Sequence, residues 1–439
     1  MELPRYVREC MDALEQAGYA AYAVGGCVRD ALLGLTPHDY DLCTAALPEQ
    51  TEAVFAGRPL VLAGQKHGTV GVITDSGVVE ITTFRREGGY DDNRHPDWVE
   101  FVPDIQQDLA RRDFTVNAMA WSPERGLVDP FGGRDNLEQK ILRAVGEPER
   151  RFREDSLRIL RGVRFAVRYG LKLDYETGKA MAALAPLMDH LARERVLEEM
   201  NRLLPLVTAE DLLRFSPVLT AVIPELKPMV GFDQRSPYHA YDLYTHTAHV
   251  TAATPRDLVL RWAGLLHDVG KVPTFTVDED GRGHFYGHDQ TGAQLADQIL
   301  RRLKAPTALR EQVVCLIGCH MLPLEEDKKL LRRRISRLGW DTVEKLLALQ
   351  RADNSSKGTD NTAELERFDR VAALLEQIRQ EDACLSLRDL QVDGNDLMAL
   401  GFRGRDVGLC LQTLLGRVLD EQIPNRRQSL LEEAKKLLP

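Results

Sequence analysis

The sequence predicts an α+β protein, with a mixed or antiparallel sheet in an N-terminal head and an elongated, all-helical remainder. Short apolar runs alternate with turn residues as far as about residue 143, which is typical of strands in a small domain. Beyond that point the apolar residues recur at helical spacing. The length of 439 residues suits about three domains or more. We place a head at residues 1–142, a helical neck at 143–205, a helical body at 206–380 and a helical tail at 381–439.

The head should begin with a helix over residues 6–17. The apolar run 19–24 and the alternating run 78–83 are expected to be strands. The segment 85–96 is polar, contains glycines and lacks apolar periodicity, so we expect a mobile loop there. A cluster of turn residues at 129–133 lies near the end of the head.

Asp39 and Asp41 are the first candidate site residues. In a strand, residues at i and i+2 point to the same face, so both carboxylates would face one way and Tyr40 would turn into the core. Paired carboxylates suit Mg²⁺, and two ions about 3.5–4 Å apart activate a 3′-hydroxyl and stabilise a leaving pyrophosphate. A lone Asp-x-Asp is more often a solvated turn, but its neighbours here favour a site.

Those neighbours are Gly25 and Gly26, which follow the apolar run. Paired glycines let backbone amides approach phosphate oxygens, and Arg29 would add a cation one helical turn later. Together with the two aspartates, this segment predicts a nucleoside triphosphate site.

A strongly periodic helix is expected to open at residues 154–158. Asp155 and Arg158 would be neighbours on its surface. Aspartate accepts hydrogen bonds and arginine donates them, so the pair matches a base edge with a donor beside an acceptor. Cytosine and adenine offer that edge, whereas uracil and guanine offer the reverse. The pair would therefore accept CTP and ATP alike; the alternative is an ordinary surface ion pair.

The same helix carries an arginine stripe. Residues 143–172 contain nine Lys or Arg against four Asp or Glu, in a chain whose net charge is −10. No acidic residue lies between the first and last arginine of the stripe, so a triphosphate or RNA phosphate is the expected partner. The stripe consists of Arg158, Arg161, Arg164 and Arg168.

The sequence resembles the bacterial class (class II) of CCA-adding tRNA nucleotidyltransferases and the related poly(A) polymerases. The motifs that carry the resemblance lie at residues 25–30, 39–41, 111–118 and 154–158, with arginines at 161 and 164. The resemblance implies a polymerase-β-like head that adds CCA to tRNA from CTP and ATP. It implies Mg²⁺ at Asp39 and Asp41, and nucleotide binding by Gly25, Gly26, Arg29, Arg112, Asp113, Asp155, Arg158, Arg161 and Arg164.

Glu80, on the run 78–83, is the candidate third carboxylate of the catalytic set. The alternative is a solvent-facing strand residue. In the family that the chain resembles, a loop equivalent to 85–96 is needed for the final adenosine, so its presence implies that A is added.

A second metal site is predicted in the body. His246, then His267 with Asp268, then Asp353 follow the order of an HD metal site, with His288 and His320 between them. The apolar run 258–266 should be a buried helix whose C-terminal end presents His267 and Asp268, with Gly270 ending it. Imidazole and carboxylate ligands suit Ni²⁺, Mn²⁺, Fe or Zn²⁺, whose bound water can hydrolyse phosphoesters. This part resembles the HD phosphohydrolase domain fused to some of these enzymes; whether it is catalytic or a scaffold stays open.

The remaining features bound the protein's environment. The N-terminal residues lack the hydrophobic stretch of a signal peptide, and no apolar run approaches the ~20 residues of a membrane span, so we expect a cytoplasmic protein without a membrane partner. Seven cysteines at irregular spacing indicate reduced thiols. The breaks at 401–408 and 425–427 resemble the family's tRNA-contacting tail, and the alternative is plain helix connections.

The sequence therefore predicts template-independent CCA addition to tRNA from CTP and ATP. Three alternatives remain. The first is an A-adding enzyme or poly(A) polymerase of the same chemistry, the second is an HD phosphohydrolase as the main activity, and the third is a non-enzymatic RNA-binding scaffold.

Overall fold

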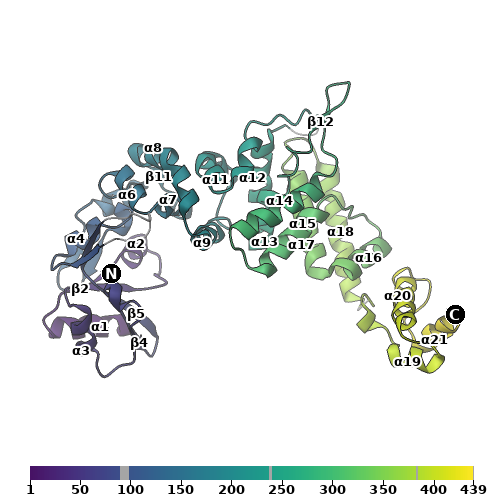
Figure 1. Ribbon diagram of the computed structural model, residues 1–439, viewed down its shortest axis with the longest axis horizontal. Helices are drawn as coiled ribbons and strands as arrows, with labels where there is room; N and C mark the ends of the chain where they lie inside the picture. The colour runs from purple at the N-terminus through teal and green to yellow at the C-terminus, as the bar shows by residue number, and fades with distance from the viewer. Residues whose placement is uncertain (89–97, 237–239, 382–383, 439) are drawn as a thin grey trace. The chain divides into compact units, whose positions relative to one another are not determined.

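A computed structural model describes residues 1–88, 98–236, 240–381 and 384–438 (Figure 1). These residues fold as two compact units. The first contains residues 1–206 and 214–224, and the second contains 207–213 and 225–439. The finer division into head, neck, body and tail stays a prediction.

A seven-stranded mixed sheet forms the centre of the head, as the sequence predicts. Its strand order is β3-β4-β5-β2-β1-β8-β9, in which β2 and β5 are parallel and the other neighbouring pairs are antiparallel. The β2–β5 register places Asp41 opposite Glu80. The strands are β1 (Ala21–Val24), β2 (Asp41–Thr44), β3 (Leu60–Val61), β4 (Thr69–Thr74), β5 (Gly77–Thr83), β8 (Ala120–Ser122) and β9 (Gly126–Val128).

Short helices accompany the sheet. They are α1 (Arg5–Gln16), α2 (Gly26–Leu32), α3 (Pro48–Val54), α4 (Ile105–Ala110) and α5 (Gly133–Glu138), with 3₁₀ turns η1 (Gln65–His67) and η2 (Thr115–Asn117). The predicted helix at 6–17 and strand at 78–83 are confirmed by α1 and β5.

The predicted loop at 85–96 is wrong at its start. Its first four residues form β6 (Arg85–Gly88), which pairs with β7 (Trp98–Phe101) as an antiparallel hairpin. Cross-strand pairing, including an ion pair between Arg86 and Glu100, stabilises a segment that has no apolar periodicity. The rest of the predicted loop lies outside the described residues.

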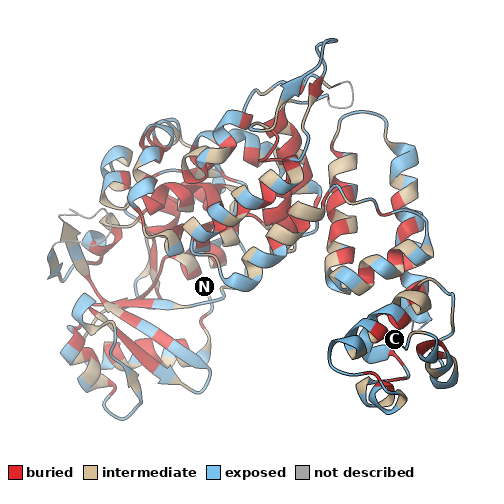
Figure 2. Cartoon of the chain, turned by 45° about the vertical axis from the view of Figure 1, so that its right-hand side comes forward, coloured by how far each residue is buried: buried red, intermediate tan, exposed pale blue. Residues whose placement is uncertain are grey.

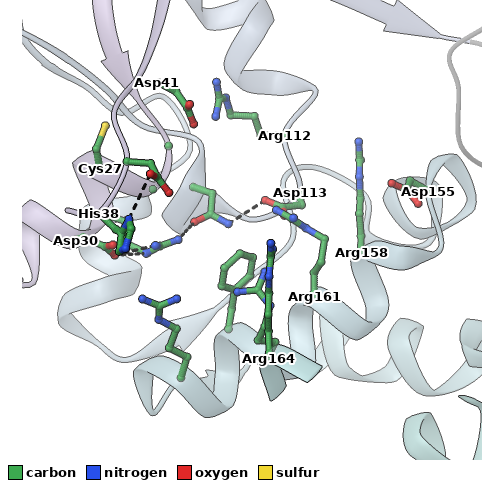
Figure 3. Close-up of a pocket in the computed structure, with 18 of the residues that line it drawn as sticks. Cys27, Asp30, His38, Asp41, Arg112, Asp113, Asp155, Arg158, Arg161 and Arg164 are labelled. Carbon is green, nitrogen blue, oxygen red and sulfur yellow. Dashed lines mark hydrogen bonds and ion pairs between the residues drawn. The ribbon is translucent and has the colours of Figure 1, made fainter. Parts of the chain in front are cut away.

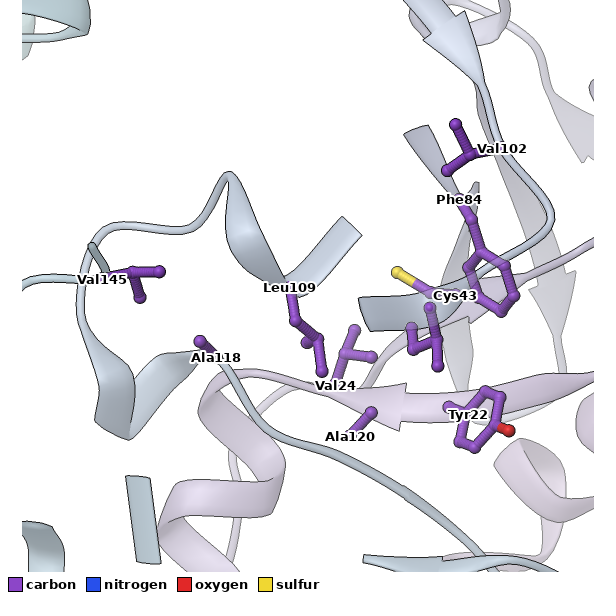
Figure 4. Close-up of a cluster of buried hydrophobic side chains, with 10 residues drawn as sticks. Tyr22, Val24, Cys43, Phe84, Val102, Leu109, Ala118, Ala120 and Val145 are labelled. Carbon is purple, nitrogen blue, oxygen red and sulfur yellow. The ribbon is translucent and has the colours of Figure 1, made fainter. Parts of the chain in front are cut away.

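An apolar cluster holds α4 on one face of the sheet (Figure 4). Its buried members include Tyr22 and Val24 of β1, Cys43 of β2, Phe84 just after β5, and Leu109 of α4. Each large apolar side chain contributes about 1.5–3 kcal/mol when buried. Val24 directly precedes Gly25, and Cys43 lies two residues after Asp41 in β2. This core therefore fixes the backbone from which the site projects.

Helices follow the sheet in the rest of the first unit. Two short strands, β10 (Ile141–Leu142) and β11 (Lys172–Leu173), form a parallel pair, and the first two of these helices lie between them in the sequence. The predicted helix opening at Glu154 is wrong in detail, because one helix ends there and the next begins at Leu157. The elements are α6 (Pro148–Glu154), α7 (Leu157–Tyr169), α8 (Tyr175–Leu184), η3 (Ala185–His190), α9 (Arg193–Leu203) and α11 (Ser216–Val222). Two elements near the boundary, α10 (Ala209–Arg214) and η4 (Pro224–Met229), belong mainly to the second unit.

The second unit is mainly helical, as predicted. Figure 2 shows its buried residues gathered where helices face one another. A small hairpin, β12 (Thr276–Val277) with β13 (Gly283–His284), interrupts the helices. The other elements are α12 (Leu243–Ala253), α13 (Leu258–Leu266), α14 (His288–Arg302), α15 (Thr307–Cys319), α16 (Lys328–Leu338), α17 (Trp340–Ser355), α18 (Thr362–Gln380), η5 (Leu387–Asp389), α19 (Gly394–Leu400), α20 (Arg405–Leu419) and α21 (Arg427–Lys435).

Two further observations bear on the protein's environment. Within the described ranges, no helix has both the length and the apolar character needed to cross a membrane. All seven cysteines are free, as expected for reduced thiols.

Candidate active site

A cavity of about 500 Å³ lies in the first unit (Figure 3). All the site residues that the sequence predicts in the head and neck line it, except Glu80. The lining therefore includes Gly25, Gly26, Arg29, Asp39, Asp41, Arg112, Asp113, Asp155, Arg158, Arg161 and Arg164. Their individual roles stay predictions.

Two carboxylates, Asp39 and Asp41, line the sheet side of this cavity, and the exposed Glu80 lies beside Asp41 without lining it. Asp41 is the first residue of β2, Asp39 precedes it in an exposed loop, and Glu80 is the strand neighbour of Asp41. Desolvation raises the pKa of Asp41, Glu80 and Asp39 raise it further, and Arg112 lowers it. Mutual repulsion of this kind is relieved by a divalent cation, so the donor set fits one.

The predicted orientation of Tyr40 is wrong. Because β2 begins only at Asp41, the alternation of a strand does not extend back to Tyr40, and its side chain is half-buried instead of lying in the core.

Gly25 connects the glycine turn to the arginine side of the cavity. Its φ of +72° belongs to a region that glycine adopts readily and other residues avoid. A Cβ at this position would also lie 2.7 Å from Nη1 of Arg112. The absence of a side chain at Gly25 thus leaves space for the Arg112 guanidinium.

Arg29 is buried and held from several sides. Its Nε donates to Asp30 at 2.8 Å and its Nη1 donates to Oδ1 of Asn117 at 2.5 Å. Its guanidinium also lies 4.3 Å from the ring centroid of Tyr169 and 5.3 Å from that of Phe165. This cation is rigidly positioned at the cavity wall.

Asp113 is buried and forms a two-pronged ion pair with Arg161. Oδ2 of Asp113 accepts from Nε and Nη2 of Arg161 at 2.9 and 2.7 Å, and Oδ1 accepts from the Asn117 amide at 3.0 Å. Burial by itself would raise the pKa of Asp113, but the Arg161 charge and the Asn117 hydrogen bond lower it to about 2.

Asp155 and Arg158 are not paired with each other. Asp155 caps the end of α6, and its carboxylate accepts from Arg195 of α9 at 2.9 Å. Arg158, on α7, donates to Glu154 at 3.2 Å and to the backbone carbonyl of Arg111 at 3.1 Å. The alternative of an ordinary ion pair between the two is therefore wrong, and the two groups are held by separate partners beside one cavity.

The arginine stripe has acidic partners, although no acidic residue lies between its first and last arginine in the sequence. Arg161 is paired with Asp113, and the buried Arg164 donates to Glu199 of α9 at 2.6 Å. Arg168 packs 5.3 Å from the ring centroid of Tyr169. The partners come from distant parts of the chain, so counting charges within the helix could not find them.

The six predicted HD residues come together in the second unit. His246 projects from α12, His267 and Asp268 follow α13, His288 begins α14, His320 follows α15 and Asp353 lies in α17. The Nε2 atoms of His267, His246 and His288 lie 3.1, 3.6 and 3.6 Å from the Asp268 carboxylate, and that of His246 lies 3.0 Å from Asp353.

The other nitrogen of each histidine ring faces the backbone. Each Nδ1 lies 2.6–3.2 Å from a carbonyl oxygen. Such contacts orient imidazoles so that Nε2 is available to a metal. The carbonyls belong to Ser356, Gly264, Phe285 and Ile317, facing His246, His267, His288 and His320 in that order.

The protonation states also suit ligation. Burial and the neighbouring His267 lower the pKa of His320 to about 4. Burial opposes ionisation of Asp268, but His267 and Lys271 hold its pKa well below the usual range. Burial alone would lower the pKa of His267, but the Asp268 and Asp353 carboxylates raise it, so metal binding there would displace a proton from the ring. His320 is already the neutral donor that a divalent transition metal needs.

Comparison with known proteins identifies the kinds of domain in this chain. Residues 21–143 match the poly A polymerase head domain, 170–229 match the family described as probable RNA and SrmB- binding site of polymerase A, and 238–357 match the HD domain. A CCA-adding enzyme of Bacillus velezensis is 32% identical over 427 residues, which is 95% of this chain and 94% of that protein. The chain belongs to the CCA-adding enzyme family. The predicted resemblance is thereby confirmed.

Other members of the CCA-adding enzyme family extend the comparison. A Geobacillus thermodenitrificans enzyme is 47% identical, but the alignment spans 44% of this chain and 47% of that protein. The crystal structure of the Bacillus stearothermophilus CCA-adding enzyme in complex with CTP has a TM-score of 0.70 and 27% identity, covering 100% of this chain and 98% of that one. A nucleotidyltransferase head of this kind implies a divalent metal, and the HD match marks the histidine cluster as a possible metal site.

Sequence reasoning missed several residues of this CCA-adding family member's cavity. Asn117, Phe165, Arg195 and Arg202 also line it. Asn117 lies within the quoted motif 111–118 and so carried a signal. Arg195 and Arg202 lie on α9, outside every motif, and only the packing of α7 against α9 brings them to the cavity.

Proposed function

We propose that this protein rebuilds the CCA end of tRNA from CTP and ATP without a nucleic-acid template. Membership of the CCA-adding enzyme family supports this function. The observation that carries it is the head cavity, in which carboxylates, a glycine turn and anchored arginines face the same space. In this proposal the partners are tRNA, CTP and ATP. The compartment is the cytoplasm, because its reducing environment suits the seven free thiols.

Asp39 and Asp41, with Glu80 as the third carboxylate, would hold Mg²⁺ in this proposal. Bound Mg²⁺ would lower the pKa of the tRNA 3′-hydroxyl and compensate the negative charge on the leaving pyrophosphate. The glycine turn at Gly25 and Gly26 admits the triphosphate close to the backbone. Arg29, Arg112, Arg161 and Arg164 form the cationic wall, and Asp113 orients Arg161.

Base choice would rest on Asp155 and Arg158. Their separate anchoring supports this role, since Arg195 holds the carboxylate and the Arg111 carbonyl holds the guanidinium. Two fixed groups of opposite hydrogen-bonding character select cytosine and adenine over uracil and guanine.

The decisive experiment uses tRNA transcripts lacking CCA, CA or only the final A. Each is incubated with Mg²⁺ and CTP, ATP or both, and the product length is measured. Full CCA on all three supports the proposal. Extension of only the CC-ending transcript would indicate an A-adding enzyme, and many adenosines from ATP alone would indicate a poly(A) polymerase.

The convergence of His246, His267, Asp268, His288, His320 and Asp353 favours a second function, metal-dependent hydrolysis of phosphate esters. Ni²⁺, Mn²⁺, Fe or Zn²⁺ suits these donors, and such a metal would supply an activated water. Metal content and p-nitrophenyl phosphate hydrolysis should both fall in His267→Ala. Hydrolysis that is unaffected by this substitution would remove the second function.

A further inference from the structure

The centre formed by the six histidine and aspartate residues is accessible at Asp353. Its side chain is 22% exposed, whereas those of His246, His267 and Asp268 are 0–2% exposed. A cavity of about 520 Å³ adjoins this exposed carboxylate and is also lined by His320. Among the described residues, this cavity therefore joins the centre to solvent.

The lining of this cavity is cationic beyond the metal ligands. Lys357 and Arg367 line it, and Glu325 is the one further carboxylate in the lining. Lys357 donates to Oδ1 of Asn354 at 2.8 Å, and within the described chain it forms no ion pair with a carboxylate. Its charge is therefore available to an anion next to the centre.

Arg367, on α18, also lines the cavity. Its Nη1 donates to the Leu324 carbonyl at 2.6 Å, and its Nη2 lies 2.8 Å from Glu364. Gln350 donates to the carbonyls of His320 and Leu322 at 2.9 and 2.7 Å. The segment that follows α15 is thus tied to both α17 and α18, which gives the cavity a built wall.

We propose that this cavity is the substrate site of the second centre and that Lys357, assisted by Arg367, binds the phosphate of a phosphate ester. The inference rests on the proposed phosphohydrolase function. A volume of about 520 Å³ is within the range of small-molecule sites and exceeds what a phosphate group fills, so the organic part of the ester occupies the remainder.

The test uses full-length protein carrying Asp39→Ala and Asp41→Ala, which removes the head's carboxylate pair, and phosphate bound by the same protein without Mn²⁺ is subtracted as the contribution of the head arginines. After loading with Mn²⁺, equilibrium dialysis with radiolabelled inorganic phosphate gives a dissociation constant. Lys357→Gln should weaken phosphate binding about tenfold and Lys357→Arg should restore it, because one charge-assisted contact is lost and regained. Arg367→Gln should also weaken it. Matched controls outside the lining, Lys345→Gln on α17 and Arg379→Gln on α18, should leave it unchanged.

Elemental analysis of manganese separates the two proposals. Retained Mn²⁺ with weakened phosphate binding in Lys357→Gln supports the substrate site. Retained Mn²⁺ with phosphate binding equal to that of the controls overturns the site and leaves the phosphohydrolase standing. Equal Mn²⁺ content in the parent protein and in His267→Ala overturns the phosphohydrolase. Glycerol 2-phosphate should displace the radiolabelled phosphate at a lower concentration than unlabelled phosphate does. If a higher concentration of glycerol 2-phosphate is needed, the site binds free phosphate and the proposed ester site is wrong.

Discussion

At the scale of single residues, the site is determined by neighbouring side chains in the cavity lining that hold each functional group in place. Arg195 holds Asp155, Asn117 holds Arg29, and Arg161 is matched by Asp113. Removing a group that contacts substrate should therefore differ measurably from removing the group that positions it.

Asp155→Ala should reduce the preference for CTP and ATP over UTP and GTP by at least about tenfold, because a site loses one of its two base contacts. Arg195→Ala should cause a smaller loss, since Asp155 remains but is less well oriented. The preference is measured as the incorporation of each of the four nucleotides on transcripts that end in CC or in C. Arg193→Ala, on the same helix and paired with Asp189, is the control. Unchanged base preference in Asp155→Ala would contradict the proposed role.

Gly25→Ala should weaken nucleotide binding more than its effect on folding explains. The new Cβ would displace the Arg112 guanidinium, in addition to about 1–3 kcal/mol of backbone strain at φ +72° and ψ −120°. Gly34→Ala is the matched control, because its φ of +71° is similar but nothing lies within 4 Å of the added Cβ. The KM for CTP and the melting temperature separate the two effects; an equal KM in both variants would refute the Arg112 explanation.

The lowered pKa of Asp113 makes a prediction about pH. Its pKa is about 2 in the folded protein, below the usual ~3.9 of an unfolded aspartate, so ionisation stabilises the fold above pH 4 and this stabilisation is lost as pH falls toward 2. The contribution is on the order of 2 kcal/mol. Urea unfolding between pH 6 and pH 3 should show a steeper loss for the natural chain than for Asp113→Asn. The prediction would be contradicted if the free energy of unfolding fell equally with pH in the two proteins.

At the scale of elements, the contact between α7 and α9 decides how the arginine stripe works. Arg164 and Glu199 are 6% and 4% exposed and form an ion pair in this contact. The helix is amphipathic in sequence, yet half of its arginine stripe is buried, because Glu199 of α9 compensates the charge of Arg164 and Glu154 of α6 compensates that of Arg158.

Arg164→Ala should destabilise the first unit by about 3–5 kcal/mol, since it leaves the Glu199 carboxylate buried without its main partner. The exposed Arg168→Ala on the same helix should change stability by less than about 0.5 kcal/mol. Urea unfolding followed by circular dichroism measures both. Similar losses in the two variants would show that burial of the pair does not govern its contribution.

At the scale of the whole molecule, two chemically different sites lie in two separately compact units. Mn²⁺ added to metal-depleted protein should raise the melting temperature through the second unit, because a ligand that binds only the folded state stabilises it. The rise should persist in Asp39→Ala/Asp41→Ala and disappear in His267→Ala. A rise that instead depended on the head carboxylates would place the stabilising metal in the first unit.

Much of this organisation follows from local pattern. Alternating and helical periodicity located β5, α1 and α13, and the order and spacing of ligand-type residues located both sites. These features depend on residues close together in the chain, whose geometry within one strand or helix is regular.

The sequence by itself determined the α+β head, the helical remainder, the family and the residue types of both sites. Only the tertiary structure decided that Asp155 is held by Arg195, that Glu199 neutralises Arg164, and that Lys357 stands beside the second centre. The physical reason is that ion pairing and burial depend on distance in space, and residues 35 or 40 positions apart come into contact only after helices pack.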